Sequence, residues 1–245
     1  MSIKILVNGA AGRMGKTAVI AIENDSAVTL VGAAGKDSDL VTTIANTKPD
    51  VVVDLTTAHS VYKNSLAIIH AGCHPVIGTS GLTQAQIVEL QQLCDDKKLG
   101  GAIVPNFSIG AVVMMNLAAQ AAKFLPHVEI VEHHHEQKID APSGTAIKTA
   151  ELIAKARSTV PQYPDTKETH EGSRGAEIDD IHIHAIRLPG VVAKQQVLFG
   201  GNAETLTIEH NSIDRQSFMP GLLLACKRVP ELNKLVYGLD VLLGL

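Results

Sequence analysis

The first hundred residues alternate short apolar runs, rich in β-branched residues, with longer stretches in which apolar positions recur at helical spacing. The apolar runs predict strands at residues 3–7, 28–33, 51–55, 75–78 and 101–104. The stretches between them predict helices at residues 14–23, 39–46, 60–71 and 83–95. Because strands and helices alternate at this spacing, we expect a parallel sheet with helices on both faces.

After residue 107 the pattern changes to a long apolar helix, followed by strand-like runs that are separated by turns. It predicts helices at residues 112–125 and 145–157, and strands at residues 128–132, 181–188, 195–199 and 205–210, the last three antiparallel. The polar residues 158–176 predict a long surface loop. A final helical stretch at residues 221–229 is expected to return to the first domain.

The two patterns together predict an α/β protein with two domains. We expect residues 1–106 and 217–245 to form a Rossmann-type, doubly wound parallel sheet that binds a dinucleotide. We expect residues 107–216 to form a C-terminal α+β domain with a mixed or antiparallel sheet.

Composition narrows the class of partners. Hydrophobic residues make up 45% of the chain and charged residues 19%, so a sizeable core can form. A formal net charge of −4 provides no basic field for a phosphate backbone, which argues against nucleic-acid binding. Cys73, Cys94 and Cys226 form no paired motif, as in proteins of a reducing compartment. With no signal sequence and no apolar run of about 18 residues, we expect a cytoplasmic protein without membrane contact.

A glycine-rich segment, NGAAGRMG at residues 8–15, follows the first predicted strand and opens the first predicted helix. Gly9 permits a tight turn, Gly12 lets the backbone approach a pyrophosphate, and Gly15 lets the helix lie close to the strand. The alternative is an ordinary strand-to-helix turn. We favour a dinucleotide site, with cofactor contacts from Gly9, Ala10, Ala11, Gly12, Arg13 and Met14.

The choice of dinucleotide depends on the end of the second strand, where Lys36 is followed by Asp37. A carboxylate at this position binds the ribose 2′-hydroxyl of NAD, whereas cations accommodate the 2′-phosphate of NADP. Because Lys36 and Arg13 can both reach a 2′-phosphate, we expect NADPH to be preferred, with NADH possible through Asp37.

Two further strand ends carry small or polar residues. In an open α/β sheet, ligands lie outside the carboxyl ends of the strands, so both segments are expected to flank the nicotinamide. Their predicted contacts are Gly78, Thr79, Ser80, Val104, Pro105, Asn106 and Phe107. The alternative is that both segments are simple turns.

Three consecutive histidines, His133 to His135, follow the predicted strand at residues 128–132. A zinc site needs three or four converging ligands, but neighbouring residues on a strand point to opposite faces, so only His133 and His135 could share a metal with a third ligand. A solvated polar loop is the second alternative. We favour proton and anion chemistry without a metal.

That preference depends on the residues that follow. Histidine exchanges protons near neutrality, and His134 is followed by Lys138, which carries a positive charge and three donors. Ser143 is a predicted N-cap, and the helix start at Gly144 and Thr145 offers N–H groups to a carboxylate. The segment therefore predicts a site for a small dicarboxylate with a protonatable centre.

The segment EIVEHHHEQKIDAPSGTA, residues 129–146, resembles the signature of the 4-hydroxy-tetrahydrodipicolinate reductase (dihydrodipicolinate reductase) family. Other segments that resemble the family span the chain: GAAGRMG at 9–15, DLT at 54–56, GTSG at 78–81, VPNFSIGA at 104–111, HAIRLPG at 184–190 and SFMPGLL at 217–223.

The resemblance implies reduction of 4-hydroxy-tetrahydrodipicolinate to tetrahydrodipicolinate by NADPH or NADH, with loss of water, on the diaminopimelate route to lysine. It implies that the domain at residues 107–216 binds substrate and forms a homotetramer. It also implies an acid/base role for His134 and proton donation by Lys138. The substrate-binding residues that it implies are His135, Ser143, Gly144 and Thr145. The family often has an acidic residue near position 36, so Lys36 argues against strong use of NADH.

Two other functions stay open at this point. One is a different nicotinamide enzyme of similar two-domain build, acting on another small amino-acid precursor. The other is a non-enzymatic NADPH-binding sensor, which has no need for a histidine and a lysine beside an anion-binding helix start.

Overall fold

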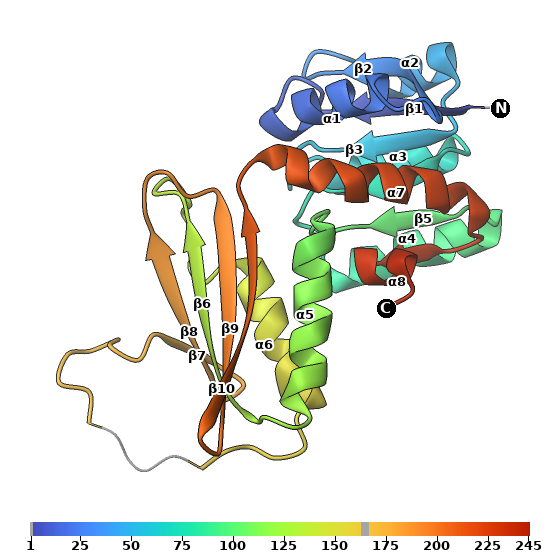
Figure 1. Cartoon of the computed structure of the whole chain (residues 1–245). Helices are drawn as coiled ribbons and strands as arrows, with labels where there is room; N and C mark the ends of the chain where they lie inside the picture. The colour runs from blue at the N-terminus through green and yellow to red at the C-terminus, as the bar shows by residue number, and fades with distance from the viewer. Residues whose placement is uncertain (1, 163–166) are drawn as a thin grey trace. The chain divides into compact units, whose positions relative to one another are not determined.

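The structure is a computed structural model that describes residues 2–162 and 167–245 (Figure 1). The chain divides into two compact units: unit 1 comprises Met1–Ile109 and Arg215–Leu245, and unit 2 comprises Gly110–Asp214. The bounds of these units lie a few residues from those of the predicted domains, whose binding roles stay proposals.

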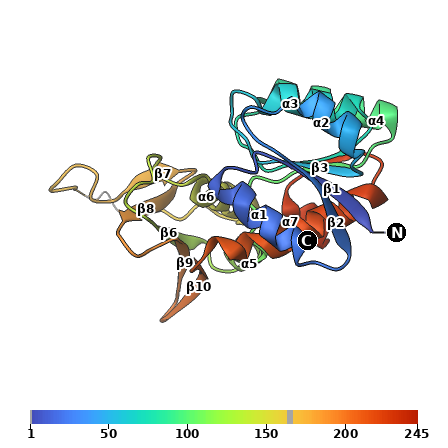
Figure 2. The same cartoon turned by 90° about the horizontal axis from the view of Figure 1, so that it is seen from above.

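In the described residues, unit 1 contains a six-stranded parallel sheet with the order β11-β5-β4-β3-β1-β2. Its strands are β1 Ile3–Asn8, β2 Val28–Ala34, β3 Val51–Asp54, β4 His74–Ile77, β5 Gly101–Ile103 and β11 Leu235–Tyr237. Its main helices are α1 Arg13–Glu23, α2 Leu40–Thr47, α3 Val61–His70, α4 Gln84–Lys97 and α7 Met219–Arg228. Figure 2 shows α2, α3 and α4 over one face of the sheet and α1 and α7 over the other, which confirms the predicted doubly wound architecture.

Local sequence explains these elements. The β-branched run Val51–Val53 is fully buried, as befits a strand covered by helices on both faces. Asp39 accepts a hydrogen bond from the Thr42 N–H and so caps α2. Thr83 and Gln86 form a reciprocal capping box at the start of α4.

Several short elements were not predicted. The chain returns to unit 1 through the 3₁₀-helix η1, and α7 is followed by a second 3₁₀-helix, by β11 and by a terminal helix. The bounds of the two 3₁₀-helices and of the terminal helix are η1 Arg215–Phe218, η2 Val229–Glu231 and α8 Leu239–Leu243. The predicted return of the last long helix to the first domain is confirmed by α7, which packs against α1.

Unit 2 contains a mixed sheet, which in the described residues has five strands in the order β10-β9-β6-β8-β7. Its elements are β6 His127–His134, β7 Ala176–Ile178, β8 Ile181–Arg187, β9 Ala193–Gly201, β10 Glu204–Ser212 and α6 Gly144–Ala156, together with α5 Ile109–Ala122, which begins at the boundary. The predicted α+β domain with a mixed sheet is confirmed. The strands β8, β9 and β10 are not three neighbouring antiparallel strands, however, because β6 lies between β8 and β9 and runs parallel to β8.

Helices α5 and α6 cover one face of this sheet, as Figure 1 shows, and the core of unit 2 lies between them and the strands. Alternate residues of β6 and β9, such as Ile130 and Phe199, point into this core, so their neighbours lie on the face that neither helix covers. That second face, which carries Leu198 of β9 and His133 of β6, is called the open sheet face below.

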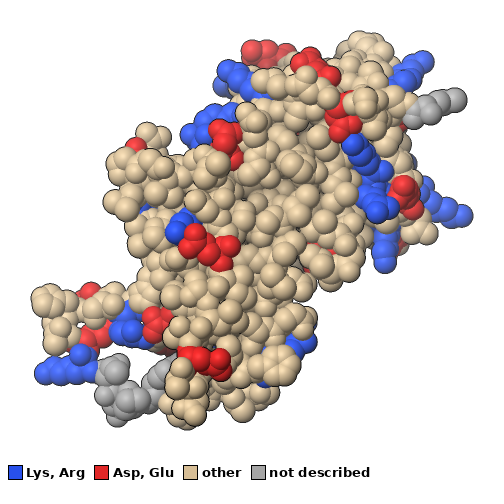
Figure 3. Space-filling view, viewed as in Figure 1, with Lys and Arg blue, Asp and Glu red and all other residues tan. Residues whose placement is uncertain are grey.

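The predicted surface loop at residues 158–176 has no helix or strand in its described parts, 158–162 and 167–175, and β7 begins at Ala176. The remaining part of that prediction, residues 163–166, lies outside the described residues. Across the residues that the structure describes, no helix combines the length and the apolar character needed to cross a bilayer. On the face drawn in Figure 3, acidic and basic side chains are interspersed among uncharged ones.

Candidate active site

The glycine-rich segment forms a tight turn at the carboxyl end of β1. Gly9 has a φ of +88°, and a Cβ atom there would lie 2.5 Å from the Leu55 carbonyl oxygen, so a larger residue would be strained and would clash. The N–H groups of Gly9 and Ala10 donate to the Ala34 carbonyl at 2.9 and 3.0 Å. These bonds join the turn to the end of β2.

The same turn brings α1 close to the strand. A Cβ atom on Gly15 would lie only 2.1 Å from the Gly9 carbonyl oxygen, so Gly15 is required for this packing. Gly12 is the N-cap residue of α1, and in the described residues no side chain caps this helix. Gly12 and Arg13 are exposed, so a turn with uncapped N–H groups faces solvent and fits an anion such as a dinucleotide pyrophosphate.

The other predicted cofactor segments lie at the ends of β4 and β5. A Cβ atom on Gly78 would lie 2.5 Å from Cε2 of the Phe107 ring, so Phe107 packs directly against this glycine. Val104 and Phe107 are buried, whereas Thr79 and Asn106 are half-buried. Ser80 and Pro105 are exposed, as are Lys36 and Asp37 beyond β2, so all four are accessible.

In unit 2, a buried carboxylate lies at the end of β6. Glu132 and His134 are two residues apart on one strand and share a face, and Nδ1 of His134 lies 2.6 Å from Oε2 of Glu132. The Arg187 guanidinium, at the end of β8, donates to both Glu132 oxygens at 2.9 Å. Parallel pairing of β6 with β8 places His134 and Arg187 at the same register.

These contacts determine the charge of Glu132 and the tautomer of His134. Burial alone would raise the pKa of Glu132, but hydrogen bonds from His134 and Arg187 outweigh it and lower the pKa to about 2. Since an ionised carboxylate only accepts, His134 must carry a hydrogen on Nδ1. Its Nε2 is therefore the ring atom that can exchange a proton with a bound molecule.

Glu132 also connects this cluster to the start of α6. The Ser143 N–H donates to Oε1 of Glu132 at 3.0 Å, and Oγ of Ser143 accepts from the Ala146 N–H at 3.2 Å. The predicted N-cap is thus confirmed, and Ser143 is buried with its backbone and side chain both engaged. A Cβ atom on Gly144 would meet no atom within 4 Å, so the backbone here is open to a ligand.

Lys138 lies on the turn between β6 and α6. Its Nζ donates to both carboxylate oxygens of Asp140 at 2.8 Å, and Arg187 Nη2 donates to the Asp140 carbonyl at 2.8 Å. The hydrogen bond from Lys138 lowers the pKa of Asp140. Through Asp140 and Arg187, the Lys138 turn is connected to the Glu132–His134 pair.

The remaining histidines lie apart from this network. His133 lies on the open sheet face and is half-buried, with its Nε2 buried and without a partner among the described residues. His135 is half-buried, and Glu136 and Gln137 are exposed. Within residues 2–162 and 167–245, no group of three or more His, Cys, Asp or Glu side chains is arranged to hold a metal ion.

Three residues of the network were absent from the predicted site: Glu132, Asp140 and Arg187. All three lie in segments that resemble the family, but none of them was predicted to have a role. Period-two alternation along the strand could have placed Glu132 on the face of His134. Nothing local could have placed Arg187 there, because its position depends on the pairing of β6 with β8.

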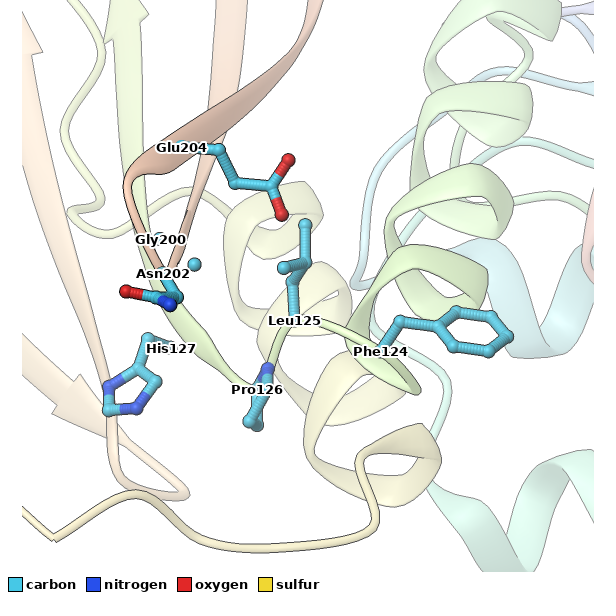
Figure 4. A pocket seen from close by; sticks show the side chains of 8 residues that line it. Phe124, Leu125, Pro126, His127, Gly200, Asn202 and Glu204 are labelled. Carbon is cyan, nitrogen blue, oxygen red and sulfur yellow. The ribbon is translucent and has the colours of Figure 1, made fainter.

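An open cavity of about 730 Å³ lies elsewhere in unit 2, between the end of α5 and the β9–β10 turn (Figure 4). It is lined by Phe124, Leu125, Pro126, His127, Gly200, Gly201, Asn202 and Glu204. None of these residues belongs to the predicted site, so the chemistry described above does not involve this cavity.

Comparison with protein families gives two matches that together span the chain. Residues 3–107 match the model described as "Dihydrodipicolinate reductase, N-terminus", and residues 110–243 match "Dihydrodipicolinate reductase, C-terminus". The 4-hydroxy-tetrahydrodipicolinate reductase of Legionella pneumophila (strain Philadelphia 1) is 53% identical over 99% of this chain and 100% of its own length. That of Coxiella burnetii (strain Dugway 5J108-111) is 49% identical over the same shares.

Solved structures agree. A dihydrodipicolinate reductase from Paenisporosarcina sp. TG-14, with dipicolinate bound, superposes with a TM-score of 0.90 and is 42% identical, covering 98% of this chain and 99% of its own. An amine dehydrogenase from Mycobacterium smegmatis, 12% identical with a TM-score of 0.67 over 98% and 96% of the two chains, shares the fold alone. The chain therefore belongs to the dihydrodipicolinate reductase family, whose members are 4-hydroxy-tetrahydrodipicolinate reductases.

Proposed function

We propose that this chain carries out its family's reaction with NAD(P)H bound to unit 1 and substrate bound beside the buried Glu132–His134–Arg187 cluster of unit 2. The family assignment makes the chain an NAD(P)H-dependent oxidoreductase of lysine biosynthesis by way of diaminopimelate. The observation that carries the proposal is the buried Glu132, which orients His134 beside the start of α6 and the Lys138 turn.

The proposed cofactor site comprises the Gly9 to Met14 turn with the segments after β4 and β5. When bound, NAD(P)H supplies a hydride. Uncapped N–H groups at the start of α1 bind the pyrophosphate, and the close packing around Gly9 and Gly15 keeps this backbone in place. The contacts proposed at the other two strand ends are Gly78, Thr79, Ser80, Val104, Pro105, Asn106 and Phe107.

The proposed substrate site offers a dicarboxylate two cations, Lys138 and Arg187, which in the structure pair with Asp140 and Glu132. The relative from Paenisporosarcina binds dipicolinate, a planar dicarboxylate. In this chain, one carboxylate binds at the start of α6, at Gly144 and Thr145, where backbone N–H groups and the helix dipole favour an anion. Ser143, predicted to bind substrate, instead donates its N–H to Glu132 and caps the helix. His135 contributes a further contact, and Lys138 and Arg187 add positive charge.

His134 and Lys138 handle the proton. Adding a hydride to a conjugated imine builds negative charge on the ring, which a nearby proton donor neutralises in the transition state. Lys138 donates this proton, and His134 acts as acid and base through Nε2 because Glu132 occupies its Nδ1. Loss of water from the hydroxylated substrate requires the same kind of proton transfer.

The test follows NADPH absorbance while the product of dihydrodipicolinate synthase is added. We expect consumption only in the presence of that compound. Binding of NADPH without consumption would support a sensor, and consumption with another amino-acid precursor would support a different nicotinamide enzyme.

We further propose that NADPH is preferred over NADH, with NADH still accepted. Lys36 and Arg13 are exposed cations beside the proposed ribose position, and Asp37 lies next to Lys36. Lys36→Ala should raise the KM for NADPH several-fold and leave the KM for NADH nearly unchanged. A wild-type preference for NADH that Lys36→Ala does not alter would contradict this.

We also propose that the cytoplasmic protein is a homotetramer that associates through the open sheet face. Leu198 on this face is 38% exposed in the single chain, and the edge strands β7 and β10 leave the sheet unpaired at both sides. Leu198→Asp should dissociate the tetramer in analytical ultracentrifugation. The matched control is Val88→Asp, at an exposed position of α4 in unit 1, which should leave the assembly intact.

A further inference from the structure

We propose that Asp54, a buried carboxylate at the end of β3, is a positioning residue that holds three strand-end segments of unit 1 in the arrangement that binds the dinucleotide. This inference depends on the proposed function, since it requires unit 1 to bind NAD(P)H. Asp54 is fully buried and does not itself need to touch the cofactor.

One carboxylate oxygen of Asp54 is shared by two amide side chains. Oδ2 accepts from Nδ2 of Asn8 at 2.9 Å and from Nδ2 of Asn64 at 2.8 Å. Asn8 is the last residue of β1 and directly precedes Gly9, and Asn64 lies on α3. This oxygen therefore joins the start of the glycine turn to β3 and to the helix that follows it.

The other oxygen is bound by two hydroxyl groups. Oδ1 accepts from Oγ1 of Thr56 at 2.7 Å and from Oγ1 of Thr79 at 2.6 Å. Thr79 belongs to the proposed cofactor segment after β4, and its Oγ1 also accepts from the Thr56 N–H at 2.8 Å. The segments after β3 and β4 are thus joined to each other and to Asp54.

The topology explains why one residue can reach all three segments. The strand order reverses between β1 and β3, because β2 lies on one side of β1 and β3 on the other. Ligands of open α/β sheets bind at such a reversal, outside the carboxyl ends of the strands. Asn8 and Asp54 are register partners across this reversal, and Ile77 of β4 pairs with Asp54 on its other side.

Electrostatics makes the arrangement sensitive to the charge of Asp54. In the part of the chain that the structure describes, no lysine or arginine pairs with this carboxylate. A buried anion needs hydrogen bonds in place of water, and here neutral donors from four residues supply them. Hydrogen bonds to a charged group are stronger than neutral ones, so the segments that carry these donors are held tightly.

Replacing Asp54 with asparagine keeps the shape but removes the charge. The new amide has one acceptor oxygen and one NH₂ group, and that NH₂ group would face either the amide donors of Asn8 and Asn64 or the hydroxyl groups. In the first orientation both amide contacts are lost. In the second, the two hydroxyl groups would have to reverse and accept, although Thr56 Oγ1 already accepts from Ser60 and Asn64, and Thr79 Oγ1 from the Thr56 N–H. We expect the Gly9 turn and the Thr79 segment to be displaced by this mismatch.

The experiment compares Asp54→Asn with Asp50→Asn in the full-length protein. Asp50 precedes the other end of the same strand, and its exposed side chain accepts from the Lys4 N–H at 2.8 Å. Direct titration should show at least tenfold weaker binding of NADPH and of NADH to Asp54→Asn, and unchanged binding to Asp50→Asn. In turnover, Asp54→Asn should raise the KM for the dinucleotide tenfold or more and leave the KM for the substrate unchanged.

A second pair of variants separates positioning from general stability. Thr56→Ser keeps the hydroxyl donor and should retain wild-type dinucleotide affinity, whereas Thr56→Val removes it and should weaken binding. Melting temperatures are measured alongside. Wild-type affinity in Asp54→Asn, or a lower melting temperature with unchanged affinity, would overturn the inference. If the wild type binds neither dinucleotide, the proposed function fails, and the role of Asp54 fails with it.

Discussion

The Lys138 amine is paired with Asp140, at 2.8 Å from both carboxylate oxygens. The two side chains differ in exposure: Lys138 is 21% exposed and Asp140 is 64% exposed. An ion pair with one such exposed partner contributes only about 0.2–1 kcal/mol. A substrate carboxylate or ring can therefore replace Asp140 at small cost, which is what a proton donor on this turn requires.

Removing either proton-handling side chain should abolish most turnover. Lys138→Ala and His134→Ala should each lower kcat by about 10²-fold or more, because the charge that develops on the ring loses its proton donor. NADPH affinity, measured by titration, should change little. The control is Lys148→Ala, which removes an exposed lysine on α6 that pairs with Glu151. Wild-type turnover in either of the first two variants would refute the assignment.

Replacing Glu132 with glutamine should impair turnover although Glu132 is buried and makes no proposed contact with substrate. The neutral side chain no longer requires a hydrogen on His134 Nδ1 and leaves Arg187 without its charged partner. We expect kcat to fall about tenfold or more and the pH profile of kcat to shift. Glu151→Gln, at an exposed position of α6, is the matched control. An unshifted pH profile with normal kcat would show that Glu132 does not orient His134.

Glu132 also makes the free energy of unfolding depend on pH in the acidic range. Its pKa is about 2 in the folded protein and near the usual 4.5 when unfolded, so the unfolded chain binds more protons between these values. Stability from Glu132 is present above about pH 4.5 and is lost as the pH falls towards 2, by on the order of 3 kcal/mol. Urea unfolding at several pH values should show that the free energy of unfolding falls less on acidification in Glu132→Gln than in the wild type.

Changing either of two glycines near the Gly9 turn to alanine should have sharply different effects on the melting temperature. A Cβ atom on Gly15 would lie 2.1 Å from a backbone oxygen, whereas one on Gly35 would meet no atom within 4 Å. Overpacking of this kind costs about 1–3 kcal/mol. Gly15→Ala should therefore lower the melting temperature by several degrees, and Gly35→Ala should not. Equal melting temperatures would contradict the close contact between α1 and the Gly9 turn.

The three cysteines should be unreactive in the native protein. Burial raises the pKa of Cys94 and of Cys226 to about 12, and burial also raises the pKa of Cys73. Because the thiolate is the reactive form, a thiol reagent near neutral pH should label none of the three rapidly. Unfolding in denaturant should expose all of them. Rapid labelling of the folded protein would mean that one of these regions opens readily.

The sequence predicted the parallel sheet well because its strands are short buried runs between helices, a pattern visible within each segment. Helix starts were less accurate: Asp39, Ser60 and Thr83 were predicted as helical but are the N-cap residues of α2, α3 and α4. The strand β11 was missed because its three residues show no periodicity.

In the candidate site, residues that lie in one segment could be predicted, whereas contacts between strands far apart in the chain could not. His134, Lys138 and the α6 start lie in one continuous segment, so a single motif identified them. The partnership of Glu132 with Arg187 joins two strands far apart in the chain, and the neighbours of a strand in a mixed sheet cannot be read from its own residues. The Asp54 network likewise depends on the strand order of unit 1.

The late position of β11 has a consequence for synthesis of the protein. The strand that pairs with β5 is Leu235–Tyr237, and the helix that packs against α1 is Met219–Arg228. A ribosome must therefore translate past Tyr237 before the sheet of unit 1 has its last strand. Until then the nascent polypeptide exposes the edge of β5 and one side of α1, so transcripts truncated in the second half should yield aggregation-prone products that chaperones retain.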